Sequence, residues 1–207
     1  MLAWIDLEAT SLLTTAHVLE VAAIVTDDQL QEVDRFHRVI YWDGADGLSG
    51  LDADSPDEVV AEAALARIEL ARIDLVVARL HARNGLWAAS YASPYLLPEV
   101  DDELAAFLAR TSRGADGSTA QIAGSSIWFD RGLMAVSLPL ALKQLHYRTV
   151  DVTTLNEMAR RFWPSLLAGI PQKREIHRAM PDVEDSLALG RYYAERISNS
   201  LLSEGAL

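Results

Sequence analysis

The 207-residue sequence contains no cysteine, which excludes disulfide bonds, thiolate zinc sites and cysteine nucleophiles. It also lacks any apolar run near the roughly 20 residues that cross a bilayer, and no secretory signal peptide is recognisable at its start. Both absences fit a cytoplasmic protein without a membrane partner. The length suits one domain of ordinary size.

Basic residues are scarce. Only 18 Lys and Arg stand against 30 Asp and Glu, which gives a net charge of −12. Proteins that hold long nucleic acids present basic surfaces, because each phosphate contact releases counterions. Here the basic residues are scattered, so a long duplex or long single strand is a poor candidate ligand. A small anionic ligand held by a few local groups and metal ions fits the composition.

The hydrophobic pattern predicts a mixed α/β fold. Strands are predicted at residues 2–8, 18–26, 36–42, 121–125 and 148–152. Helices are predicted from 58 to about 81, from Pro94 or Pro98 through 108, from near 130, over 153–163, and from near Pro181 to about 197. Three early strands with short connections favour an antiparallel meander. The alternating helices and strands that follow indicate a mixed sheet with helical layers.

Two segments depart from this regular pattern. Residues 43–57 are rich in Gly, Asp, Ser and Pro and are predicted to form a loop. Together with the start of the next helix they make an extended acidic segment of about 43–73. The small, polar residues 199–207 are expected to be a disordered tail, which leaves one domain over 1–198.

Asp6 and Glu8 lie two residues apart in the otherwise apolar first strand. Because a strand alternates its faces, both carboxylates point the same way. Two like charges on an apolar strand are costly unless a cation neutralises them, and hard divalent ions such as Mg²⁺ or Mn²⁺ bind carboxylate oxygens. The alternative is a strand with one solvated, acidic face.

Three later segments carry further candidate groups. Asp130 follows the fourth strand near a helix start, where it could instead be an N-cap. Pro181 favours a helix N-terminus, so His177 lies on the preceding loop and Asp182 in the first turn. Asp182 could merely complement the helix dipole, and His177 could be a solvated loop residue. Asp151 ends the fifth strand and could cap the next helix.

The order of these groups is more informative than any one of them. Residues 4–10, 124–130, 147–155 and 177–182 present Asp-x-Glu, then Asp, then His-x-x-x-x-Asp. This order resembles the DEDDh family of 3′–5′ exonucleases, and within it the oligoribonucleases, which cut RNA fragments of two to five residues. The resemblance implies a ribonuclease-H-like fold. Its mixed five-stranded sheet would have three antiparallel N-terminal strands, then two parallel ones, flanked by helices.

The resemblance also implies catalytic roles. Asp6, Glu8, Asp130 and Asp182 would hold two divalent ions, Mg²⁺ or Mn²⁺, around the scissile phosphate. One ion would ready the attacking water and the other would steady the leaving 3′-oxygen. His177 would be the general base, a role that suits an imidazole because it gains and loses a proton near neutral pH.

Substrate contacts follow from the same resemblance. Leu12 matches a leucine that wedges against a base, Ser126 matches a serine that caps the 5′-phosphate, and His81 matches a histidine of the substrate pocket. Tyr147 and Arg148 match a pair that reaches this phosphate from the neighbouring subunit, which implies a homodimer. The alternative for Tyr147 and Arg148 is a strand-edge pair packed locally.

The sequence departs from the family pattern at three places. Thr10-Ser11-Leu12 replaces Thr-Gly-Leu, and Gly124-Ser125-Ser126 replaces Gly-Asn-Ser. Val76 occupies the position of a tryptophan that stacks on a substrate base, a contact worth roughly 1–3 kcal/mol. Trp87 and Trp128 are the aromatic residues that could replace it. These departures bear on the preference for dinucleotides more than on the nuclease chemistry.

The sequence therefore predicts a metal-dependent 3′–5′ exoribonuclease that hydrolyses very short single-stranded RNA, with dinucleotides preferred, to 5′-mononucleotides. One alternative is a DEDDh exonuclease acting on single-stranded DNA or longer RNA, which would need a basic approach groove. Another is a non-catalytic nucleotide-binding or interaction module. Loss of a ligand would favour that module, whereas all five expected positions are filled.

Overall fold

The computed structural model describes residues 1–46, 48, 73–114 and 116–203. Most of the predicted acidic segment of 43–73 lies outside the described residues. Of its described part, Asp43–Ala45 form a short 3₁₀ helix, η1. No described helix is both long enough and apolar enough to span a membrane.

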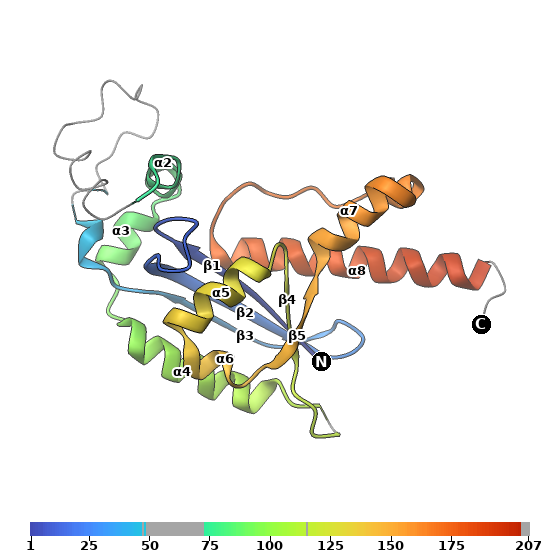
Figure 1. Cartoon of the computed structure of the whole chain (residues 1–207), viewed down its shortest axis with the longest axis horizontal. Coiled ribbons are helices and arrows are strands. Elements are labelled where there is room, and N and C mark those ends of the chain that lie inside the picture. Colours follow the sequence, from blue (N-terminus) through green and yellow to red (C-terminus); the bar gives the residue numbers. More distant parts are fainter. Residues whose placement is uncertain (47, 49–72, 115, 204–207) are drawn as a thin grey trace.

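Five strands form the central sheet in the order β3-β2-β1-β4-β5 (Figure 1). They are β1 (Leu2–Ala9), β2 (Val18–Thr26), β3 (Glu32–Val39), β4 (Gln121–Gly124) and β5 (His146–Asp151). β1, β2 and β3 pair antiparallel, whereas β4 runs parallel to β1 and β5 runs parallel to β4. The predicted mixed sheet is confirmed.

The third strand begins earlier than predicted. Asp27 Oδ1 accepts hydrogen bonds from the backbone N–H groups of Gln29 and Gln31 at 2.9 and 2.8 Å. These bonds close a short turn, so β3 starts at Glu32. β3 is an edge strand on which Phe36 is the buried residue. Its sequence is mostly polar and lacks the apolar alternation that identifies a strand. For this reason the predicted range 36–42 was wrong at both ends.

The helices are α2 (Leu75–Arg83), α3 (Leu86–Tyr91), α4 (Leu97–Thr111), α5 (Trp128–Ser137), α6 (Pro139–Leu142), α7 (Val152–Phe162) and α8 (Ala179–Ser203), with a 3₁₀ turn η3 (Pro164–Leu167). The short helices α3 and α6 were not predicted. α8 continues past the predicted end at Ile197 to Ser203. Residues 199–203 are therefore helical, and the prediction of a disordered tail from 199 was wrong for them.

The two sheet faces have separate cores. α4, α5 and α6 pack over one face, where β1 contributes Ile5 and Leu7. α8 crosses the other face, where β1 contributes Trp4 (Figure 1). Gly190 of α8 permits this approach, because a Cβ there would lie 2.3 Å from the Trp4 ring. The alternation of β1 places Asp6 and Glu8 on the α8 face with Trp4.

Candidate active site

Three elements bring the predicted acids together. Asp6 and Glu8 come from the end of β1, Asp130 from the first turn of α5, and Asp182 from the first turn of α8. With His177, which precedes α8, they line one cavity of about 330 Å³. Carboxylate oxygens of Asp6, Glu8 and Asp182 lie within 4.8 Å of one another. All five residues predicted to be catalytic thus meet in one pocket.

Asp130 does not cap a helix. The N-cap of α5 is Ile127, and Asp130 lies inside the first turn. Its buried Oδ1 accepts the backbone N–H of Leu7 at 2.9 Å, which fixes the carboxylate beside the end of β1. The N-cap alternative is therefore wrong, and the side chain is held where Asp6 and Glu8 lie.

Burial, with repulsion between neighbouring acids, raises the pKa values of Asp6, Glu8 and Asp130. Burial raises the pKa of Glu8 to about 8, with Asp182 and Glu20 adding to it. Burial also raises the pKa of Asp130 to about 7, against the hydrogen bond from Leu7. The pKa of Asp6 rises for the same reason, with repulsion from Asp130 and Glu8. When ionised, this cluster has an excess of buried negative charge.

The cluster has the donor set of a divalent metal site. Asp182 Oδ1 is buried and has no hydrogen-bond partner among the described residues, while its Oδ2 lies 3.3 Å from Lys173 Nζ. The side chain of Glu8 is only 13% exposed, which rules out the solvated strand face considered above. Hard cations such as Mg²⁺ and Mn²⁺ take carboxylate oxygens of this kind, so the residues fit the expected ions.

His177 reaches the pocket from a strained backbone. Its φ is +52°, in the left-handed region that non-glycine residues rarely adopt. Its carbonyl accepts a hydrogen bond from Asn84 Nδ2, and Arg178 beside it forms a bidentate ion pair with Glu20. Sequence reasoning missed Glu20, Asn84 and Arg178. One signal was available for Glu20, which is the lone charge in the apolar run of β2.

Glu20 differs from the four acids that line the pocket. Burial favours a higher pKa for this carboxyl, but hydrogen bonds from His37, Arg178 and the Ala179 N–H outweigh burial and lower the pKa to about 2. Glu20 is therefore ionised and fully partnered. Its negative charge is neutralised by the protein's own Arg178, so Glu20 needs no metal ion.

Ser126 has a second strained backbone, with φ +52°. Its N–H donates to Asp151 Oδ1 and to Thr153 Oγ1, both at 3.0 Å. Asp151 also accepts the Thr153 N–H at 2.9 Å, so the predicted cap of the helix after β5 is confirmed. These contacts hold Ser126 on the wall of the pocket, beside Ser125.

The other predicted substrate residues are divided between the pocket and its surroundings. Leu12 lines the pocket and is 74% exposed. Tyr147 and Arg148 are exposed on the edge strand β5 and do not line this pocket. The Arg148 guanidinium lies 5.6 Å from the centre of the Tyr147 ring. His81 is buried, and its Nε2 lies 3.0 Å from the Ala9 carbonyl oxygen. That burial argues against direct contact between His81 and a ligand in the pocket.

Trp87 and Trp128, the two residues that could take over the stacking role of the tryptophan absent at position 76, differ in exposure. Trp87 is fully buried and its Nε1–H donates to the Ala78 carbonyl at 2.8 Å, so it has no free ring face. Trp128 lines the pocket and is 70% exposed. Val76 is exposed on α2. Trp128 is thus the tryptophan that a ligand in this pocket can reach.

Solved structures of exonuclease I have the same fold. The enzyme from Methylocaldum szegediense aligns with a TM-score of 0.57 and 16% identity, over 94% of this chain and 40% of its own. The E. coli enzyme bound to a dT13 oligonucleotide aligns with a TM-score of 0.58 and 11% identity, over 97% of this chain and 43% of its own. The chain thus spans less than half the length of these neighbours. No family model matches the chain.

This ribonuclease-H-like sheet, with four carboxylates and a histidine at one end of its central strands, defines an exonuclease of the DEDDh type, which uses divalent metal ions. Curated oligoribonucleases are similar along nearly the whole sequence. Those of Rhodococcus jostii, Corynebacterium efficiens and Mycobacterium tuberculosis are 33%, 35% and 34% identical over 93% of this chain, and 85%, 76% and 79% of their own lengths are covered. The chain belongs to the oligoribonuclease family, a family of hydrolytic 3′–5′ exoribonucleases, as its motif order predicts.

Proposed function

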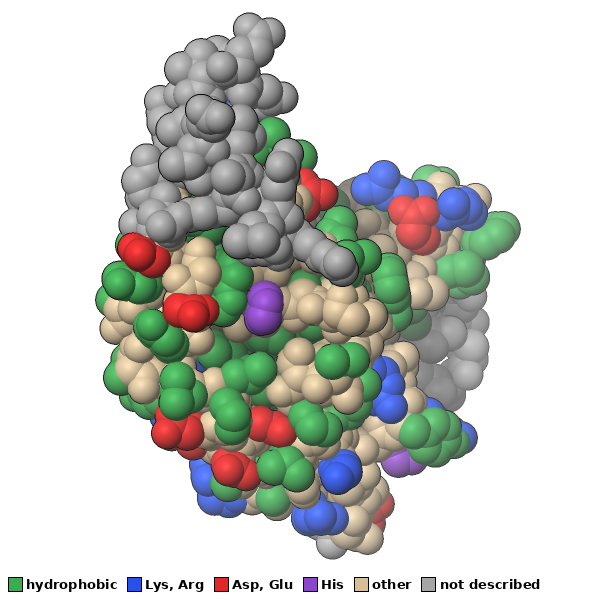
Figure 2. All heavy atoms as spheres, turned by 60° about the vertical axis from the view of Figure 1, so that its left-hand side comes forward, with side chains coloured by type: hydrophobic (Ala, Val, Ile, Leu, Met, Phe, Trp, Pro, Cys, Tyr) green, Lys and Arg blue, Asp and Glu red, His purple; other side chains and the backbone are tan. Residues whose placement is uncertain are grey.

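We propose that the domain over residues 1–198 hydrolyses very short single-stranded RNA, with dinucleotides preferred, and releases 5′-mononucleotides. The observation that carries this proposal is the convergence of five catalytic candidates in a cavity of about 330 Å³. That volume is at the lower end of the roughly 300–1,000 Å³ of small-molecule sites. Lys and Arg are scattered on the face shown in Figure 2, which gives a long strand little to follow.

In this mechanism Asp6, Glu8, Asp130 and Asp182 would hold two divalent ions, Mg²⁺ or Mn²⁺. When bound, such ions make water easier to deprotonate and stabilise charge on the leaving oxygen. His177 accepts a proton of the attacking water as the water oxygen bonds to phosphorus. The bond from phosphorus to the 3′-oxygen breaks, and the departing 3′-oxygen takes up a proton from solvent. Burial of the carboxylates strengthens their electrostatic interactions with a bound ion.

Exposed apolar side chains can receive the bases. Leu12 and Trp128 border the acids, so a nucleotide with its phosphate at the carboxylates has apolar surface beside it. We propose that Trp128 supplies a stacking surface in place of the tryptophan absent at Val76. The Ser126 hydroxyl, on the same wall, is suited to donate to a terminal phosphate.

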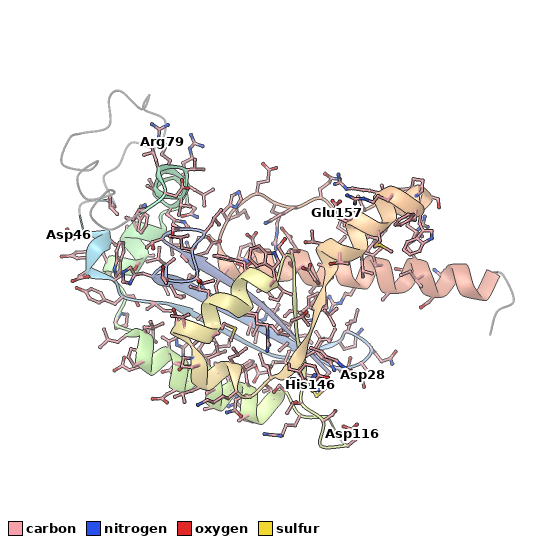
Figure 3. All side chains as sticks on the ribbon, in the orientation of Figure 1. Asp28, Asp46, Arg79, Asp116, His146 and Glu157 are labelled. Atoms are coloured by element: carbon pink, nitrogen blue, oxygen red, sulfur yellow. The ribbon has the colours of Figure 1, made fainter. Side chains whose placement is uncertain are left out.

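We further propose a homodimer in which Tyr147 and Arg148 contact the 5′-phosphate in the neighbouring subunit's site. β5 is the last strand in the sheet order, and Figure 3 marks its start with His146 and the following helix with Glu157. The exposed ring and guanidinium on this edge are available to another subunit. The ring contact between Tyr147 and Arg148 is equally compatible with a local pair. A cytoplasmic location stays a prediction.

A length series tests the substrate assignment. With Mn²⁺ or Mg²⁺, the purified protein should release mononucleotides from a 5′-phosphorylated diribonucleotide much faster than from a twenty-residue RNA, and EDTA should abolish both activities. Asp130→Asn, which keeps the shape of the side chain but not its charge, should be inactive. Equal rates on the two lengths, or faster cleavage of the deoxy dinucleotide, would refute the preference for short RNA.

A further inference from the structure

The backbone at His177 needs external support. A non-glycine residue at φ +52° carries strain on the order of 1–3 kcal/mol, and such a conformation persists only where surrounding contacts over-determine it. Glu175, two residues earlier, has φ +51°. The loop before α8 is therefore strained at the residue whose side chain must be aimed most accurately.

Three consecutive residues, the last two of this loop and the first of α8, are hydrogen-bonded to other parts of the protein. The His177 carbonyl accepts from Asn84 Nδ2. Arg178 Nε and Nη2 donate to the two carboxylate oxygens of Glu20, each at 2.8 Å, and the Ala179 N–H donates to Glu20 Oε2 at 3.1 Å. Arg178 Nη1 lies 3.4 Å from the Asn84 carbonyl oxygen, which joins the two attachments.

Glu20, to which Arg178 and Ala179 are hydrogen-bonded, lies next to the proposed metal site in the sheet. Glu20 is 1% exposed on β2, and its Cα partner across the sheet is Glu8. His37 Nε2 lies 2.6 Å from Glu20 Oε1 and fills its remaining side. The strand pair that supplies the acid Glu8 therefore also sets the position of the loop that supplies His177.

We propose that Glu20, Arg178 and Asn84 are positioning residues that hold His177 at the wall of the pocket that it lines with the four acids. The inference rests on the proposed role of His177 as the general base. A misplacement of about 1 Å can cost about 100-fold in rate, so loss of one fastening should reduce kcat by roughly 10- to 100-fold. For substitutions of Asn84, which is uncharged and does not line this pocket, KM and Mn²⁺ affinity should stay within about twofold.

Asn84 provides the mildest test. Asn84→Ala removes the donor to the His177 carbonyl, and also the acceptor that Asn84 Oδ1 offers to the Leu86 N–H at 3.0 Å. Asn84→Asp keeps that acceptor but cannot donate. Both variants should show the same loss of kcat. Arg35→Met is the matched control, because it removes an ion pair to Glu184 of α8 without touching residues 177–179.

A double-mutant cycle separates positioning from general stability. Asn84→Ala should lower kcat in the wild-type background and change it less than twofold in a His177→Ala background. An equal fractional loss in both backgrounds, or an unchanged kcat in the first, would overturn the proposal. Arg178→Lys, which keeps the charge but not the bidentate geometry, should retain more activity than Arg178→Met. Equal activities of these two variants, both folded by circular dichroism, would count against the proposal.

A readout without turnover keeps this test independent of the proposed function. The NMR signals of the His177 ring, assigned by their loss in His177→Ala, should shift or broaden in Asn84→Ala and stay unchanged in Arg35→Met. Unchanged signals in Asn84→Ala would overturn the positioning role even if the enzyme is active. A wild-type protein inactive on diribonucleotides would refute the proposed function, while the ring signals would still report on the loop.

Discussion

Glu8→Gln is expected to stabilise the metal-free protein at alkaline pH, although it removes a proposed metal ligand. On folding, burial and the neighbouring carboxylates raise the pKa of Glu8 from 4.5 to about 8. At about 1.36 kcal/mol per pKa unit, ionising this group in the folded state costs about 5 kcal/mol of stability above pH 8. Glutamine has nearly the same shape and no charge, so it avoids this cost.

The sign of the pH dependence follows from the direction of the shift. A carboxyl whose pKa rises on folding binds its proton more tightly in the native state. Its favourable contribution is therefore complete below the unfolded pKa near 4.5 and is lost as the pH rises through the folded value near 8. The metal-free wild-type protein should lose stability between pH 5 and 9. Glu8→Gln should lose less.

Urea unfolding at several pH values in EDTA, and again in Mg²⁺, measures both effects. At pH 9 in EDTA the midpoint of Glu8→Gln should exceed that of the wild type, and near pH 4 the two should converge. Mg²⁺ should raise the wild-type midpoint and have less effect on the variant, because binding to the native state stabilises it. Glu195→Gln, an exposed change on α8, is the control. A lower midpoint for Glu8→Gln than for the wild type at pH 9 in EDTA would refute the reasoning.

Three further outcomes are expected. The pKa of Glu20 falls from 4.5 to about 2 on folding, so the wild type should lose about 3 kcal/mol of folding stability from this group as the pH drops from 4.5 to 2. Acid unfolding curves of Glu20→Gln should lack this loss. Trp128→Ala should weaken inhibition by adenosine 5′-monophosphate roughly 5- to 150-fold but not inhibition by ribose 5-phosphate, and the exposed control Trp163→Ala should change neither. Lys173→Met should strengthen Mn²⁺ binding a few-fold in calorimetry, because no ammonium then competes for Asp182; weaker binding would contradict this.

The parts of the site that follow local periodicity could be predicted from sequence. β1 and β2 are apolar enough for their positions to be read from the pattern, so the shared face of Asp6 and Glu8 followed directly. Asp182 was placed in the first turn of a helix because Pro181 favours that position, and α8 begins at Ala179. Each of these predictions depends only on a few residues that are neighbours in the sequence, so it can be made without knowledge of the fold.

Contacts between distant segments could not be predicted in this way. Arg178 and Glu20 are 158 positions apart, and nothing local to either residue identifies the other. The edge strand β3 has one buried side chain, Phe36, so its bounds depend on pairing with β2 rather than on its own pattern. The short helix α3 is held by burial of Leu86 and Trp87 against residues that only the fold brings near.

Glu8 and Glu20 show why residue type and pattern leave this gap. Each is a lone or nearly lone acid in an apolar strand, and the two are direct partners across the β1–β2 pair. Around Glu20 the fold supplies its own cation, Arg178, and the pKa falls to about 2, whereas around Glu8 it supplies further acids and the pKa rises to about 8. An acid that the protein neutralises itself can fix structure, whereas an acid left among other acids is ionised only at a cost in stability that a proton or an external cation removes. The difference between the proposed positioning role of Glu20 and the proposed metal binding of Glu8 therefore lies in which partners the fold brings to each carboxylate.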